Sequence, residues 1–222
     1  MGMPILIMGK SGCGKSTSLR NFHGEEATII NVNSKQLPFR NDFKYVINTN
    51  DYNKIYASLD RSPSKVIVID DANYLMTDVF MARHQQAKGN AQFTLYNDIA
   101  DQFYTLINKI KSLPNDKIVY ILMHEEQSEN TLAVKPKTIG KLLDSTVCIE
   151  GMFTVVLRAM YIAKDKRYVF RTQTDGQDVT KSPIGMFKDF EIDNDLKAVD
   201  TVIREYWGLI DNETETVPNE TN

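Results

Sequence analysis

Ten residues near the N-terminus, MGKSGCGKST at positions 8–17, constrain the fold of this 222-residue chain more than any other stretch. They follow the apolar run Pro4-Ile5-Leu6-Ile7-Met8 and fit the pattern G-x-x-x-x-G-K-[ST]. The fixed positions of the pattern are Gly9, Gly14, Lys15 and Ser16. A strand before such a loop and a helix after it, here expected over 15–22, are typical of an α/β nucleotide-binding fold.

The loop itself predicts a phosphate site. Glycines let successive backbone N–H groups turn inward around phosphate oxygens. We expect Lys15 to reach the outer phosphates of ATP and the Ser16 hydroxyl to face Mg²⁺. The residues predicted to contact the nucleotide are Gly9, Lys10, Ser11, Gly12, Cys13, Gly14, Lys15, Ser16 and Thr17.

A second motif ends the apolar segment KVIVIDD, which covers residues 65–71. A buried strand that ends in an acid presents it at the edge of the sheet where ligands bind in α/β folds. Asp70 is therefore predicted to hold Mg²⁺, directly or through water. Asp71 has two interpretations: it orients the attacking water, or it only caps the following turn.

The rest of the chain alternates between apolar runs and helical periodicity. Strands are expected over 27–32, 45–48 and 117–123, and helices near 51–59 and over 94–113. Continuous apolar runs favour a parallel sheet covered on both faces. An antiparallel hairpin over 154–162 and 168–172 extends the sheet, and a helix over 199–207 closes the fold.

Composition narrows the setting. One domain is expected over 1–210, followed by a disordered acidic tail over 211–222 with four acids and no base. The net charge of -3 means that any contact with nucleic acid needs a local basic patch. Two cysteines, no signal peptide and no membrane-length apolar run favour a cytoplasmic protein with reduced thiols. The three histidines do not cluster, so no zinc site is expected.

Two segments are candidates for single-stranded nucleic acid. The segment 125–143 carries Lys135, Lys137 and Lys141, which could follow a phosphate backbone. The segment 77–93 sets basic side chains between two phenylalanines, which suits base stacking. The alternative for both is an ordinary solvated loop.

Arg158 interrupts the apolar strand of the late hairpin. An arginine that reaches a neighbouring subunit's γ-phosphate is a recurrent device in oligomeric ATPases, and Arg158 is a candidate for it. The alternative is a basic side chain exposed to solvent.

Several stretches together resemble the small phage-encoded ATP-binding proteins with a RecA-like core, some of which act in single-strand-annealing recombination. The matching stretches, between residue 4 and about residue 187, are MGKSGCGKST, KVIVIDD, YILMHEE, KPKTIGKLLD, EGMFTVVLRA and RTQTDGQDVTKSPIGMF. The resemblance implies ATP, Mg²⁺, self-assembly, single-stranded DNA and a single-strand-binding protein as partners. It also implies a phage gene product in the cytoplasm of a bacterial host.

The resemblance assigns roles by position. Lys15, Ser16 and Asp70 take the nucleotide roles, His124 becomes the γ-phosphate sensor, and the Lys135–Lys141 segment becomes a DNA-contacting loop. RecA proper has a catalytic glutamate after the strand beside the phosphate strand, whereas this chain reads Asn31-Val32-Asn33 there. The water-activating group is thus open between Asp71 and another residue, and hydrolysis is expected to be slow.

The leading hypothesis is an ATPase that assembles on single-stranded DNA in recombination or annealing. Two alternatives remain open. One is a nucleotide-dependent adaptor, such as a helicase loader in phage replication. The other is a nucleoside or metabolite kinase, in which the segment 77–93 would act as a lid over the phosphates.

Overall fold

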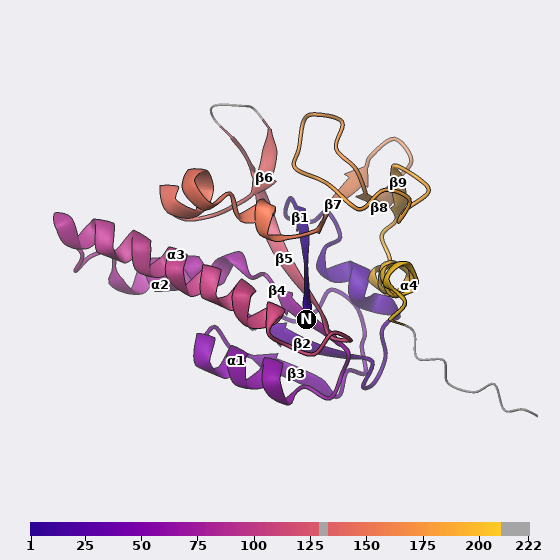
Figure 1. The fold of residues 1–222 in the computed structure, drawn as a ribbon, viewed down its shortest axis with the longest axis horizontal. Helices are drawn as coiled ribbons and strands as arrows, with labels where there is room; N and C mark the ends of the chain where they lie inside the picture. The colour runs from indigo at the N-terminus through magenta and orange to yellow at the C-terminus, as the bar shows by residue number, and fades with distance from the viewer. Residues whose placement is uncertain (129–132, 210–222) are drawn as a thin grey trace, which may run out of the picture.

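A mixed β-sheet forms the centre of the computed structural model, which describes residues 1–128 and 133–209 (Figure 1). In those ranges the strand order is β3-β2-β4-β5-β1-β7-β8-β9, with β6 paired to β5 outside this path. The strands are β1 (Met3–Gly9), β2 (Ala27–Asn31), β3 (Tyr45–Asn48), β4 (Val66–Asp70), β5 (Ile118–Gln127), β6 (Val134–Pro136), β7 (Val155–Ile162), β8 (Arg167–Arg171) and β9 (Glu191–Asp193).

Strands β3, β2, β4, β5, β1 and β7 run parallel to one another. Every residue of β2 and β4 is buried, as expected for parallel strands covered on both faces. The pairs β7–β8 and β8–β9 are antiparallel, so the late hairpin extends the sheet as predicted. The predicted α/β fold with a mostly parallel sheet is confirmed.

Helices cover the two faces of the sheet. The helices are α1 (Tyr52–Arg61), α2 (Asn73–Arg83), α3 (Asn90–Lys111) and α4 (Leu196–Trp207), with the 3₁₀ helices η1 (Ser16–Asn21) and η3 (Ile149–Met152) and the π-helix η2 (Leu142–Val147). Alternate residues of β1 enter different cores: Leu6 packs in the cluster with α1, α2 and α3, and Ile5 in the cluster with η1 and α4. Figure 1 shows α1 to α3 together on one side and α4 on the other.

The helix expected over 15–22 is present after the phosphate loop, but it is a 3₁₀ helix of six residues and not an α-helix. Ser18 explains part of the difference. Its hydroxyl donates to the Lys15 carbonyl at 2.6 Å, and so competes for an acceptor that an α-helical turn would use. The helix is therefore short, and the partial positive charge at its N-terminus is smaller than that of a long α-helix.

Two segments that the sequence suggested as loops are largely ordered elements. For 77–93 the alternative of an ordinary loop is wrong, because α2 continues to Arg83 and α3 begins at Asn90. The apolar stripe of Leu75, Met76 and Phe80 packs this helix on the core and was the missed signal. Within 125–143, strand β5 continues to Gln127 and pairs with β6 in an antiparallel hairpin.

The C-terminal helix α4 is joined to the sheet by a buried polar chain. The Tyr120 hydroxyl of β5, fully buried, donates to Asp200 Oδ1 at 2.8 Å. Asp200 also accepts from Arg204 Nε at 2.7 Å, and Arg204 donates to the Asp116 carbonyl at 2.9 Å. This chain of hydrogen bonds fixes α4 against the sheet.

The predicted tail 211–222 lies outside the described residues. No described helix is long and apolar enough to cross a membrane.

Replacing Tyr120 with phenylalanine should lower the free energy of unfolding by about 1–2 kcal/mol, because buried Asp200 loses one hydrogen-bond donor. Chemical denaturation measures the change. Tyr104→Phe on α3 is the control, since that ring is 44% exposed and its hydroxyl should contribute little. Equal effects of the two substitutions would contradict the role assigned to the buried hydrogen bonds between Tyr120, Asp200 and Arg204.

Candidate functional site

The ends of four parallel strands meet at one edge of the sheet. In the sheet register, Gly9 at the end of β1 lies beside His124 of β5, and Asn31 at the end of β2 lies beside Asp70 of β4. The segments that follow these strands therefore come together, although they are far apart in the sequence. This is the edge where α/β sheets place their ligands.

The phosphate loop turns through two glycines. Gly12 has φ +77° and Gly14 has φ +95°, a backbone conformation that other residues adopt only with strain. A Cβ atom at Gly14 would lie 2.9 Å from Cδ1 of Tyr168 and 3.2 Å from Oδ1 of Asn194. The loop therefore needs glycine at position 14 both for its backbone and for the close approach of the β8 side chain.

Lys15 is folded back onto its own loop. Its ammonium donates to the carbonyls of Gly9 and Lys10, both at 2.8 Å, and lies 3.5 Å from Nδ1 of His124. Burial lowers the pKa of Lys15 from its ordinary value. A phosphate would offer the ammonium stronger, anionic acceptors than these carbonyls.

Ser16 and Asp70 form the candidate magnesium site. The Ser16 hydroxyl donates to Asp70 Oδ1 at 2.9 Å, so both oxygens face the same point beside the loop. Oxygen atoms are the ligands that Mg²⁺ prefers, so the hydroxyl of Ser16 and the carboxylate of Asp70 have the chemistry that this ion needs. Burial, assisted by the neighbouring Asp71 charge, raises the pKa of Asp70 to about 6. A bound cation would favour the ionised carboxylate.

Asp71 has a strained backbone and a buried side chain. Its φ of +59° is uncommon for a residue other than glycine, and its side chain is only 5% exposed. The next residue is fixed to β5, because the Ala72 N–H donates to the Leu122 carbonyl at 2.9 Å. The turn therefore holds the Asp71 carboxylate in the site, where it pairs with the Lys35 ammonium.

His124 lies between Lys15 and Asp71. Its Nε2 is 3.6 Å from Asp71 Oδ1, and its backbone N–H donates to Asn73 Oδ1 at 3.1 Å. Burial, followed by the nearby Lys15 charge, lowers the pKa of His124, so the ring is neutral at pH 7. Because Lys15 donates toward Nδ1, the proton of the neutral ring belongs on Nε2, facing Asp71.

These groups line one cavity of about 350 Å³. Its lining from the predicted site comprises Ser11, Gly12, Gly14, Lys15, Ser16, Thr17, Asp70, Asp71 and His124. The sequence reasoning missed Lys35 and Tyr168, which also line it. Lys35 could have been found from its place just after β2, the strand next to β4.

The other predicted loop residues face elsewhere. Lys10 and Cys13, with Ser11 and Gly12, line a second hollow on the β7 side of the loop. Cys13 is 6% exposed, and burial raises the pKa of its thiol. Cys13 therefore contributes packing to the loop, and its thiol stays protonated. Among the described residues, no group of three or more His, Cys, Asp or Glu side chains could hold a metal ion.

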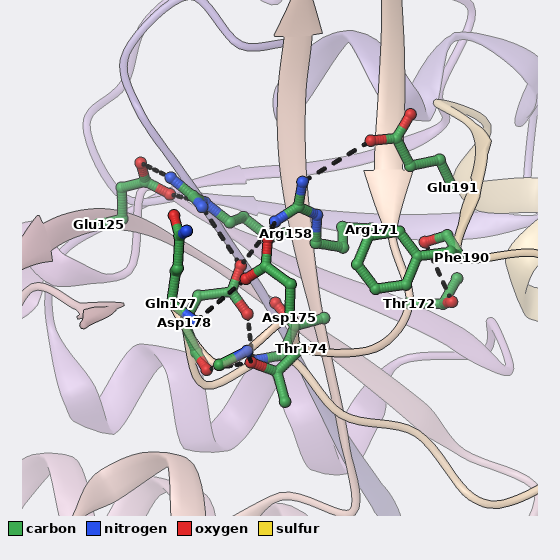
Figure 2. A network of polar contacts seen from close by, with 12 residues as sticks. Glu125, Arg158, Arg171, Thr172, Thr174, Asp175, Gln177, Asp178, Phe190 and Glu191 are labelled. Atoms are coloured by element: carbon green, nitrogen blue, oxygen red, sulfur yellow. Dashed lines mark hydrogen bonds and ion pairs between the residues drawn. The ribbon is translucent and has the colours of Figure 1, made fainter.

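Arg158 belongs to a network behind the loop, shown in Figure 2. Its guanidinium donates to both Glu125 oxygens at 2.8 and 2.9 Å and to Asp178 Oδ2 at 3.2 Å. Arg171 reaches the same Asp178 at 3.6 Å and Glu191 at 3.8 Å. Arg158 is thus engaged within its own chain, and its action on a neighbouring subunit stays a prediction that requires these pairs to break.

The three lysines predicted to contact nucleic acid are not equivalent. Lys135 is 16% exposed and pairs with Asp144, with Glu126 at 4.0 Å. Lys137 and Lys141 are exposed. The Lys137 N–H donates to the His124 carbonyl at 2.8 Å, which joins the lysine segment directly to the cavity wall.

One comparison with known proteins assigns the chain to a family. A family model described as "AAA domain" matches residues 1–184, most of the chain. The chain therefore belongs to this AAA domain family, and the site described above is that of a P-loop nucleotide-binding ATPase family. A comparison with curated proteins finds no match.

Replacing Asp70 with asparagine should make stability less dependent on pH. Because the folded pKa of about 6 lies above the unfolded value of 3.8, stability present below pH 4 is lost as pH rises through 6. The variant lacks this loss. Its free energy of unfolding should exceed that of wild type by up to about 3 kcal/mol at pH 7.5 and by little at pH 4.

Denaturant unfolding of both proteins at the two pH values measures the difference. Asp60→Asn, on the exposed surface of α1, controls for removal of one carboxylate. A gain for Asp70→Asn of the same size at pH 4 and pH 7.5 would contradict the raised pKa.

Proposed function

We propose that this protein is an ATPase that assembles on single-stranded DNA and acts in phage recombination or strand annealing. The observation that carries the ATPase part is the convergence of Lys15, Ser16, Asp70, Asp71 and His124 on one cavity. The DNA part rests on the sequence resemblance and on the exposed lysines that follow the β5–β6 hairpin.

The cavity groups suit phosphoryl transfer to water. Lys15 would leave the loop carbonyls and bind the outer phosphates, and Ser16 with Asp70 would hold Mg²⁺. Mg²⁺, when bound, neutralises phosphate charge. Asp71 would orient a water whose oxygen bonds to the γ-phosphorus. The bond from the γ-phosphorus to the bridging oxygen then breaks, ADP leaves with the electron pair, and the water proton passes through Asp71 to phosphate.

The fold also offers a route between nucleotide and DNA. His124 contacts Lys15 with its side chain and Lys137 with its backbone. We propose that a change at the terminal phosphate passes through His124 to the start of the lysine segment. We propose that ATP favours assembled copies of the chain with these segments facing a shared strand, together with a single-strand-binding protein as partner, in the cytoplasm of the bacterial host.

A nucleotide-dependent adaptor is the second candidate. The observation that favours it is the ion pair between Asp71 and Lys35. Among the described cavity residues, Asp71 is the one acid besides the proposed magnesium ligand Asp70, and the ion pair leaves it less able to activate water. Hydrolysis would then be slow and nucleotide binding would be the signal. Nucleotide-dependent co-purification with a replicative helicase, without DNA-stimulated hydrolysis, would support this candidate.

ATP hydrolysis measured with and without single-stranded DNA tests the proposal first. We expect stimulation at low salt that decreases as salt is added, because phosphate contacts release counterions. Lys15→Ala should abolish nucleotide binding and ATP-dependent assembly, while its melting temperature stays close to that of wild type. Stimulation by a nucleoside or metabolite, with none by DNA, would indicate a kinase instead.

The double substitution Lys137→Ala and Lys141→Ala should weaken single-stranded DNA binding about 10-fold and reduce the salt dependence by up to two ions. Fluorescence anisotropy with a labelled oligonucleotide at several salt concentrations measures both. The control is Lys54→Ala with Lys188→Ala, which removes the same charge from exposed positions elsewhere. Equal losses in the two proteins would mean that net charge, and not this segment, sets the affinity.

A further inference from the structure

Lys35 lines the phosphate cavity but belongs to no part of the nucleotide-binding motifs. Its ammonium pairs with the Asp71 carboxylate, and this contact raises the pKa of Lys35. The two partners differ in freedom. The Asp71 side chain is 5% exposed and fixed by its turn, whereas the Lys35 side chain is 57% exposed and can move.

Hydrogen bonds within a tight turn hold the backbone of Lys35 in place. The buried Asn31 side chain donates from Nδ2 to the Lys35 carbonyl at 2.6 Å. Ser34 adopts φ +52°, and its N–H donates to the Asn31 carbonyl at 3.3 Å. This turn at the end of β2 sends the lysine side chain across the end of β4, so the pairing with Asp71 follows from the local backbone.

The charges in the cavity explain what the lysine could do. Lys15 and Lys35 face the carboxylates of Asp70 and Asp71, so the cations and anions of this group balance. A terminal phosphate bound by Lys15 would lie close to Asp71 and be repelled by it. Lys35 is the cation with the reach and exposure to move from the carboxylate to that phosphate.

We propose that Lys35 is a second phosphate-binding cation, which pairs with Asp71 in the nucleotide-free protein and transfers to the γ-phosphate when ATP binds. This inference rests on the proposed nucleotide function and adds a group that recognises the triphosphate. ADP lacks the γ-phosphate, so Lys35 stays with Asp71. The transfer releases the Asp71 carboxylate to act on water only when a triphosphate is present.

Binding of a fluorescent non-hydrolysable ATP analogue and of fluorescent ADP, both with Mg²⁺, tests the transfer without measuring activity. Lys35→Ala should weaken the ATP analogue about 10- to 100-fold, the cost of a charge-assisted contact, and leave ADP within about twofold. Lys44→Ala is the matched control, because Lys44 lies in the same connection but pairs with Glu25 on the surface. It should change neither affinity.

Asp71→Asn gives the opposite result. Asparagine tolerates the left-handed backbone at this position, and it frees Lys35 in advance, so the ATP analogue should bind more tightly. In the Lys35→Ala background the same substitution should give a smaller gain, because it then only removes the repulsion between the Asp71 carboxylate and the phosphate. The double variant also leaves no unpaired buried charge, so it keeps the comparison valid if Lys35→Ala is unstable.

Four outcomes would overturn the inference. One is an equal effect of Lys35→Ala on the ATP analogue and ADP. Another is a gain from Asp71→Asn that is as large without Lys35 as with it, which would indicate simple removal of negative charge. If wild type binds neither nucleotide, the proposed function fails together with this inference, whereas binding of both with no dependence on Lys35 leaves the proposed function intact.

Discussion

The parallel register of β1, β5, β4 and β2 is the constraint on which the site depends. It sets Gly9 beside His124 and Asn31 beside Asp70, so the ends of β1, β2 and β4 lie at the same level of the sheet as His124 within β5. The apolar side chains that bury these strands on both faces therefore also fix the distances between the polar groups that follow them. A shift of one strand by one residue would move its polar end out of the cavity and reverse its core side chains.

The four charged side chains of the cavity, and the Ser16 hydroxyl, already have partners inside the protein. Lys15 donates to loop carbonyls, Ser16 to Asp70, and Lys35 pairs with Asp71. These contacts satisfy buried charges that would otherwise be costly. A ligand must therefore replace existing contacts and does not simply add new ones. Its affinity depends on how much stronger the contact of each donor with a phosphate oxygen is than the contact with its present acceptor.

The sequence predicted the parts of the fold that carry strong local signals. The phosphate loop, the strand ending at Asp70 and the late hairpin lie where the patterns indicated. Helix α2 was missed because its first residues follow directly from the acidic motif, and its apolar stripe is short. The pairing of Lys35 with Asp71 could not be predicted, since it depends on which strands are neighbours and on a left-handed turn at a non-glycine residue.

The close packing of Tyr168 beside Gly14 limits how the phosphate loop can function outside this fold. The tyrosine comes from β8, more than 150 positions along the chain, and closes the cleft where the loop turns. The nucleotide cleft is thus shaped jointly by the loop that follows β1 and by a side chain of β8. An N-terminal fragment, or a graft of the glycine-rich segment into another scaffold, would carry the phosphate donors without the surface that gives the cleft its form.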